Sequence, residues 1–136
     1  MVSEAVDFVR SHARAVLMTH RRDGGTQASP IRVRVDESGT IVATTRATTA
    51  KARNLTRDPS CALCVISDAW RGPWLTIEAT AEIVALPDAL GQLHAFYLAR
   101  DGKVDDQADF EEMMQNEQRI IIRFTPVRSS GTALTT

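Results

Sequence analysis

The part of the chain best equipped to bind a ligand is residues 44–59, where threonines and basic side chains gather and no acid appears before Asp58. Four threonines come first, and Lys51, Arg53 and Arg57 follow them. The residue pattern changes there from strand-like to helix-like, so a strand would end in a threonine-rich turn that opens a basic helix. Free backbone N–H groups, hydroxyl donors and the positive end of a helix together favour an anion. The segment therefore predicts a site for a phosphate-bearing cofactor.

The composition is that of an ordinary globular protein. The 136-residue chain is 43% hydrophobic and 24% charged, with a formal net charge of −1. This length predicts a single domain over residues 1–136, with a flexible polar tail over 129–136. The near-neutral charge argues against a nucleic-acid partner, and no apolar run is long enough for a membrane helix. The N-terminus lacks the apolar core of a signal peptide, so we expect a cytoplasmic location.

The two cysteines, Cys61 and Cys64, have the C-x-x-C spacing of redox and zinc sites. A zinc site needs two further ligands at local spacing, and the three histidines are scattered along the chain. The pair also lies in a strand-like run, where a separation of three places the two side chains on opposite faces. We therefore predict two structural cysteines, with no disulfide between them and no bound metal.

The periodicity of apolar residues predicts a mainly β fold with peripheral helices. The predicted strands are residues 15–19, 27–35, 40–46, 61–67, 74–86 and 119–128. The predicted helices are residues 3–13, 49–57, 87–100 and 106–117. The first three strands would form a meander. Residues 120–122 are apolar on both faces, so both faces of the last strand should be covered.

Six strands joined largely by hairpins favour a small antiparallel split β-barrel of the FMN-binding-like type. A barrel of this size fills its interior with its own side chains. A bulky cofactor would therefore lie outside the barrel, and a second subunit is the economical way to complete its groove.

Four motifs support a family resemblance when they are taken in order. They are D-G-x-x-Q-x-S-P at residues 23–30, K-x-R-N-L-x-R-D-P at 51–59, G-P-W-L-T-I-E-A-T-A-E-I-V at 72–84 and F-T-P-V-R-S-S-G at 124–131. In this order and spacing they resemble the pyridoxamine 5′-phosphate oxidase-like split β-barrel proteins. More narrowly, they resemble the actinobacterial branch that uses the deazaflavin coenzyme F-420. The resemblance covers nearly the whole chain.

The resemblance implies a homodimer with two identical cofactor sites at the subunit interface. It implies that the hydride chemistry resides on the cofactor, so no side chain is assigned as catalytic and none as a metal ligand. Trp74 would reach the site from the partner subunit. The cofactor-binding positions that it implies are Gln27, Ser29, Pro30, Thr44, Thr45, Arg46, Thr49, Lys51, Asn54 and Trp74.

Several of these residues also have a purely structural interpretation. Threonines suit strand ends and helix caps, and Asn54 suits a helix end with a backbone bond. Two positions depart from the family pattern: Arg32 follows the S-P where many relatives carry an aromatic residue nearby, and Ala79 stands where many have glycine.

Three functions follow from this pattern. The first is an F-420-dependent oxidoreductase that transfers a hydride to a conjugated small molecule such as a quinone or an enone. The second is an FMN-binding oxidoreductase or flavin carrier, since the same basic groove would bind the FMN phosphate. The third is a non-enzymatic member of the fold that binds no cofactor. The sequence contains no Ser-His-Asp arrangement, P-loop or G-x-G-x-x-G, as suits chemistry carried by a flavin-type cofactor.

Overall fold

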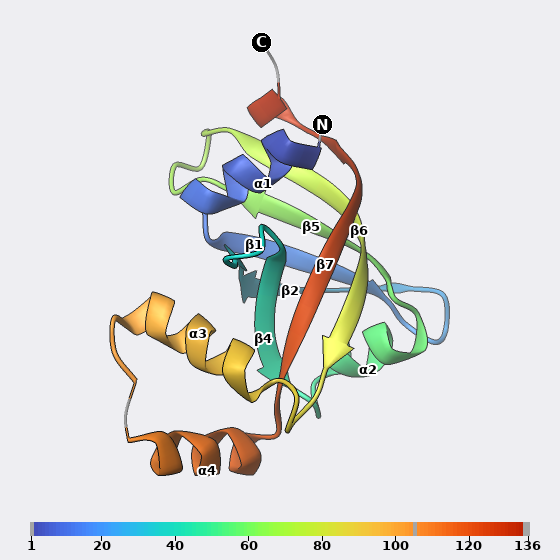
Figure 1. The fold of residues 1–136 in the computed structure, drawn as a ribbon. Coiled ribbons are helices and arrows are strands. Elements are labelled where there is room, and N and C mark those ends of the chain that lie inside the picture. Colours follow the sequence, from blue (N-terminus) through green and yellow to red (C-terminus); the bar gives the residue numbers. More distant parts are fainter. Residues whose placement is uncertain (1, 105, 135–136) are drawn as a thin grey trace.

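The computed structural model describes residues 2–104 and 106–134. Its seven strands form one curled antiparallel sheet, and four α-helices lie around it (Figure 1). The strands are β1 (Arg14–His20), β2 (Thr26–Arg32), β3 (Arg34–Val35), β4 (Ile41–Arg46), β5 (Ser60–Ile66), β6 (Trp74–Val84) and β7 (Arg119–Ser130). The helices are α1 (Val2–Ser11), α2 (Ala50–Arg57), α3 (Leu90–Asp101), α4 (Gln107–Glu117) and the 3-10 helix η1 (Thr132–Leu134). This architecture confirms the predicted fold class.

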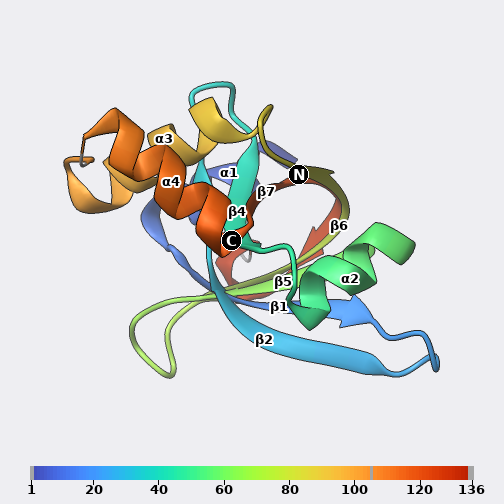
Figure 2. The same ribbon diagram turned by 90° about the horizontal axis from the view of Figure 1, so that it is seen from below.

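The prediction of six strands was wrong by one, because the predicted strand 27–35 is divided at Val33. The strand order is β2-β1-β5-β6-β7-β4-β3, so β2 and β3 lie at opposite edges of the sheet. β2 pairs with β1 and β3 pairs with β4, which leaves the predicted meander only partly formed. The N–H of the buried Val33 donates to the Ala13 carbonyl at 2.8 Å, where the chain passes between the edges. Residues 26–35 thus form one continuous segment that passes from one edge of the sheet to the other, and the sheet is curled (Figure 2).

Strand β7 separates two hydrophobic cores. Ile120 and Ile122 belong to the core inside the curled sheet, whereas Ile121 packs with Phe96 of α3 and Phe110 of α4. Both faces of residues 120–122 are therefore covered, as their pattern predicted. Helices of the same chain provide the cover, so this pattern does not itself require a second subunit.

The helix ends follow from local residue chemistry. The Asp106 carboxylate accepts hydrogen bonds from the N–H groups of Ala108 and Asp109 and caps α4. Helix α3 ends at Gly102, whose φ of 79° is the left-handed conformation that glycine adopts without strain. No helix in the described part of the chain is long and apolar enough to span a membrane.

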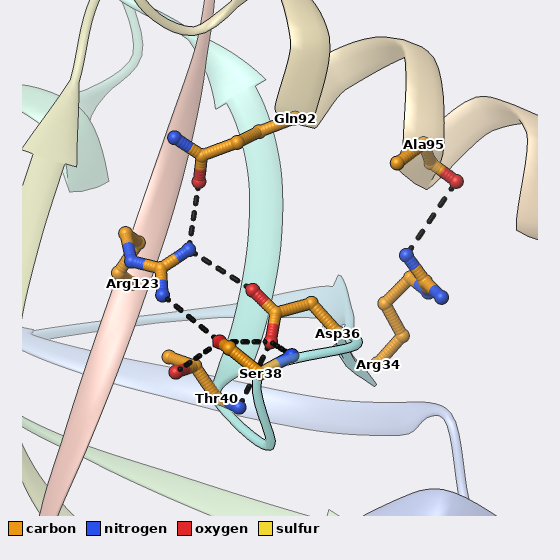
Figure 3. Close-up of polar contacts among 7 residues, drawn as sticks. All are labelled: Arg34, Asp36, Ser38, Thr40, Gln92, Ala95 and Arg123. Atoms are coloured by element: carbon orange, nitrogen blue, oxygen red, sulfur yellow. Dashed lines mark hydrogen bonds and ion pairs between the residues drawn. The ribbon is translucent and has the colours of Figure 1, made fainter.

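Arg123 of β7 fastens α3 to the β3–β4 hairpin (Figure 3). Its guanidinium donates to Asp36 Oδ2 at 3.0 Å and to Gln92 Oε1 at 2.7 Å. Burial alone would raise the pKa of Asp36, but hydrogen bonds from Ser38, Thr40 and Arg123 hold that pKa below its usual value. A surface pocket of about 490 Å³ lies beside this network, and both Asp36 and Gln92 of its lining are already bound to Arg123.

Regular structure extends into part of the segment 129–136, which was predicted to be a flexible tail. Strand β7 continues to Ser130, and η1 follows it. The backbone N–H of Trp74 donates to the Thr132 hydroxyl at 3.2 Å, and Leu134 packs against the barrel core. These contacts hold a segment whose composition alone suggested fraying. Residues 135–136 lie outside the described part of the chain.

The cysteines occupy opposite faces of β5, as predicted. Cys61 is buried in the barrel core, Cys64 is half-buried on the other face, and both are free thiols. Burial, with a smaller effect of Asp58, raises the pKa of Cys61 to about 12.

This difference predicts selective labelling of the native protein. Iodoacetamide near pH 8 should modify Cys64 well before Cys61, because the thiolate is the nucleophile and Cys61 carries almost none at that pH. Peptide mass spectrometry after timed labelling measures both rates. Equal rates at the two cysteines would show that Cys61 is not protected, and a thiol count that rises with reductant would reveal a disulfide.

Candidate functional site

Helix α2 covers one end of the barrel and brings together most of the residues predicted to bind an anion. The helix begins at Thr49, whose hydroxyl accepts from the Ala52 N–H at 3.3 Å and donates to the Arg46 carbonyl at 3.0 Å. The Thr45 hydroxyl lies 3.2 Å from that of Thr49. The threonine-rich turn therefore caps the helix through its own side chains, and Asp58-Pro59 ends it. α2 contacts β1, β2 and β6 (Figure 2).

Lys51 is the basic residue of α2 that faces the sheet. Its side chain is half-buried, and its Nζ lies 3.5 Å from Ser29 Oγ on β2. Burial, together with the nearby positive charge of Arg119, lowers the pKa of Lys51. No carboxylate in the described part of the chain pairs with this ammonium. An uncompensated, partly desolvated cation beside a hydroxyl is suited to binding an anion.

Arg119 is a member of this cluster that the sequence analysis missed. It stands opposite Arg46 in the β4–β7 register, and both bind one carboxylate oxygen of Glu117. The Arg119 Nε–Glu117 Oε1 distance is 2.8 Å, and the Arg46 Nη2–Glu117 Oε1 distance is 3.6 Å. Two arginines thus share one acid, and Lys51 pairs with no carboxylate of the described residues. Only the pairing of β4 with the distant β7 brings Arg119 here, and no local motif signals that pairing.

Gln27 places an unsatisfied acceptor at the same end of the barrel. It lies opposite Thr19 in the β1–β2 register, two residues along β2 from Ser29. Its Oε1 is buried and has no hydrogen-bond partner among the described residues. A buried carbonyl oxygen without a donor costs free energy, on the order of 1–3 kcal/mol. A ligand that carries an N–H or hydroxyl group could remove that cost, and flavin-type cofactors carry both.

Two of the predicted binding residues lie apart from this cluster on the same strands. Thr44 points to the opposite face of β4 from Thr45, and its hydroxyl donates to the Ile120 carbonyl at 2.8 Å. Pro30 is exposed on the outer face of β2, opposite Val16 of β1. Neither residue faces Lys51 within one protomer.

Asn54 joins α2 to the sheet. Its side chain is 7% exposed, and its Nδ2 donates to Thr19 Oγ1 at 3.1 Å. Its Oδ1 accepts from the Arg57 guanidinium at 3.3 Å. Both ends of the amide are therefore used inside the protein, by two side chains and not by the backbone bond that the sequence suggested.

Removing this amide should destabilise the protein. Asn54→Ala leaves the buried Thr19 hydroxyl without its donor and should lower the free energy of unfolding by about 1–3 kcal/mol. Asn116→Ala is the matched control, because Asn116 is exposed on α4 and should change stability by less than about 0.5 kcal/mol. Urea denaturation measures both values, and equal stabilities would contradict the bridging role of Asn54.

Trp74 is remote from α2 within one chain. It begins β6, whereas the α2 end of that strand lies near Thr80, which pairs with Ser60. Six residues of strand separate the two positions, about 20 Å. The indole is 41% exposed, and Gly131 approaches it so closely that a Cβ there would lie 2.9 Å from the ring. A site that contains both Lys51 and Trp74 therefore needs a second copy of the chain.

A shallow pocket of about 380 Å³ lies on the outer face of the sheet at the α2 end. Met18, His20 and Glu78 border it, together with the exposed Val127.

Ala79, where relatives often have glycine, contributes its side chain to the barrel core. Arg32, the other departure from the family pattern, stands at the far end of β2. The hydrogen bond and the charge of Arg100 lower the pKa of Asp101, and the charge of Arg32 lowers it further.

Comparison with known proteins identifies the fold on independent grounds. A family model described as pyridoxamine 5′-phosphate oxidase matches residues 1–132. No curated protein matches the sequence at a significant level.

Three solved structures show how far the likeness extends. A conserved hypothetical protein, Rv2991 from Mycobacterium tuberculosis, is 27% identical with a TM-score of 0.75, over 95% of this chain and 82% of its own. An F-420 reductase is 25% identical with a TM-score of 0.68, over 91% of this chain and 94% of its own. The heme storage protein HutZ from Vibrio cholerae is 19% identical with a TM-score of 0.72, over 93% and 91%, and shows a shared fold alone.

Proposed function

Because the chain belongs to the pyridoxamine 5′-phosphate oxidase family, we propose that it is an oxidoreductase that uses the deazaflavin coenzyme F-420. The observation that carries this proposal is Lys51, a half-buried ammonium with no carboxylate partner in the described part of the chain, beside Ser29 and Arg119. The likeness to an F-420 reductase, which extends over most of both chains, favours deazaflavin over FMN. The substrate class we propose is a conjugated, electron-poor small molecule such as a quinone or an enone.

The residues at the α2 end of the barrel would bind different groups of the cofactor. Lys51 and Arg119 would neutralise the phosphate, and Ser29 would donate its hydroxyl to the same group. Gln27 Oε1 would accept a hydrogen bond from a cofactor N–H or hydroxyl. When it is bound, the deazaflavin supplies the hydride chemistry. The protein contributes position, charge neutralisation and exclusion of water.

The proposal includes a homodimer, because one chain does not bring Trp74 to Lys51. The outer face of the sheet also leaves apolar side chains uncovered: Trp74 is 41%, Val127 66% and Ile66 39% exposed. We expect sedimentation at micromolar concentration to give about twice the chain mass of 14.9 kDa. A single species at the mass of one chain would count against the dimer and against a site shared by two subunits.

Titration of the purified protein with coenzyme F-420 and with FMN, followed by fluorescence, tests the function directly. Saturable binding of F-420 that is tighter than that of FMN is expected, and reduced F-420 should be oxidised in the presence of a quinone. A yellow protein that retains FMN through purification would favour the flavin-dependent function. Binding of neither cofactor would overturn the proposal and favour a non-enzymatic role.

A further inference from the structure

Three arginines line one surface pocket beside α2. The pocket has a volume of about 460 Å³ and lies between α2 and the β1–β2 turn. Arg53 and Arg57 are four residues apart and therefore project from the same face of the helix. Arg22 comes from the turn between β1 and β2 and lines the same pocket. The remaining lining residues are Ala47, Asn54 and Thr56.

This pocket is distinct from the Lys51 site. At 100° per residue, the directions of Arg53 and Arg57 differ from that of Lys51 by roughly 120–160° around the helix axis. The exposure of the side chains agrees with this difference in direction, since Lys51 is half-buried beside Ser29 whereas both arginines are exposed. The helix therefore presents one cation to Ser29 of β2 and two to the pocket beside the β1–β2 turn.

The positive charge in this pocket is not neutralised by the protein. The lining contains no carboxylate, and none of the three arginines forms an ion pair with a described residue. The neighbouring acids have other partners: Asp23 binds Arg21, and Asp58 accepts from the Ser60 N–H. Most other arginines do pair with acids, for example Arg123 with Asp36 and Arg128 with Glu78. Like charges four residues apart on a helix also destabilise it, by a few tenths of a kcal/mol.

The arginines are oriented by backbone contacts rather than by acids. Arg53 Nη1 donates to the Thr48 carbonyl, and Arg57 Nη2 donates to the His20 carbonyl and to Asn54 Oδ1. Each guanidinium keeps further N–H donors free, and planar guanidinium forks match the oxygens of phosphate and carboxylate. Two of the three side chains are thus held in place with donors to spare.

We propose that this pocket is a second anion site, which binds a phosphate or carboxylate group of a small molecule independently of Lys51. The proposal does not rest on the use of coenzyme F-420. The anionic group belongs either to a free metabolite or to an acidic extension of a ligand that is already bound at the α2 end of the barrel. The shared chemistry is an oxyanion held by two or more guanidinium groups.

The test is titration with inorganic pyrophosphate, followed by two-dimensional ¹H–¹⁵N NMR at constant ionic strength. Saturable shifts are expected at the amides of the β1–β2 turn and of residues 47–57. Arg22→Gln and Arg53→Gln should each weaken this binding by roughly tenfold, because each removes a charge-assisted contact. Arg71→Gln is the matched control, since Arg71 is an exposed arginine of another loop without an ion pair. It should leave the affinity unchanged, and Lys51→Ala should do so as well.

The outcomes separate the proposal from its rivals. No saturable binding, or equal weakening by Arg22→Gln, Arg53→Gln and Arg71→Gln, would show a diffuse surface charge and overturn the site. Shifts that vanish in Lys51→Ala would place the anion at the barrel end and overturn its independence. Thermal unfolding of each variant checks that the fold is intact. If F-420 with its acidic chain displaces pyrophosphate, the pocket binds the acidic extension of a ligand at the α2 end of the barrel. If F-420 and pyrophosphate bind together, the pocket binds a free metabolite.

Discussion

Replacing Lys51 with alanine is expected to weaken binding of coenzyme F-420 by roughly ten- to a hundred-fold, the equivalent of about 1.5–3 kcal/mol. The loss is large because the ammonium is half-buried and has no carboxylate of its own, so its charge is available to the cofactor phosphate. Stability should change by less than about 0.5 kcal/mol, since the one hydrogen bond of this side chain to a described residue is a long contact of 3.5 Å with the Ser29 hydroxyl. Fluorescence titration and thermal unfolding measure the two quantities.

The pH dependence of binding adds a second readout to the same variant. Burial lowers the pKa of Lys51, with a further contribution from Arg119, so the lysine loses its proton at a lower pH than an exposed lysine does. Only the protonated form attracts an anion, and affinity should therefore fall as the pH rises through that lowered pKa. Lys51→Ala should lack this decline.

Lys103 provides the matched control for Lys51. It is the other lysine of the chain and is exposed beyond the C-terminal end of α3. Lys103→Ala should leave the affinity for F-420 and its pH dependence unchanged. If Lys51→Ala binds the cofactor as tightly as the parent protein, the phosphate lies elsewhere, and the assignment of the α2 end is wrong.

Local sequence patterns predicted the helices and strands well because each pattern reports burial on one face of one element. The alternation of β6, the cap at Thr49 and the stop at Asp58-Pro59 all act within a few residues. Val33 escaped prediction because alternation continues through it, from Ile31 to Val35, while the hydrogen-bond partner changes from β1 to β4. The choice of partner is a property of the whole sheet, and no residue near Val33 encodes it.

The same distinction applies to the candidate site. Thr49 and Lys51 lie two positions apart in the sequence, and their neighbourhood was visible as a motif. Arg119 joins them only through the pairing of β4 with β7, and the buried, unpartnered oxygen of Gln27 is visible only in the folded chain. The sequence showed the basic residues of 46–57 as one motif, of which only Arg46 and Lys51 were assigned to the cofactor. The helix directs Arg53 and Arg57 away from Lys51, because residues two and six positions apart face different directions.

The two cores on either side of β7 give the second large expected effect. Ile122→Ala and Ile121→Ala should each lower the free energy of unfolding by about 2–5 kcal/mol, since each truncates a fully buried isoleucine and leaves a cavity. Urea denaturation measures both losses. Val127→Ala is the control on the same strand, and with a side chain that is 66% exposed it should cost less than about 0.5 kcal/mol.

The comparison between neighbouring isoleucines decides whether α3 and α4 are structural parts of the fold. Ile122 faces the barrel, whose strands close the core around it, whereas Ile121 is buried only by Phe96, Phe110 and other residues of the helix-side cluster. If the two helices detached readily in solution, Ile121→Ala would behave like Val127→Ala while Ile122→Ala kept its full effect. Comparable losses at both positions are expected, because a strand that is apolar on both faces is stable in water only when both faces are covered.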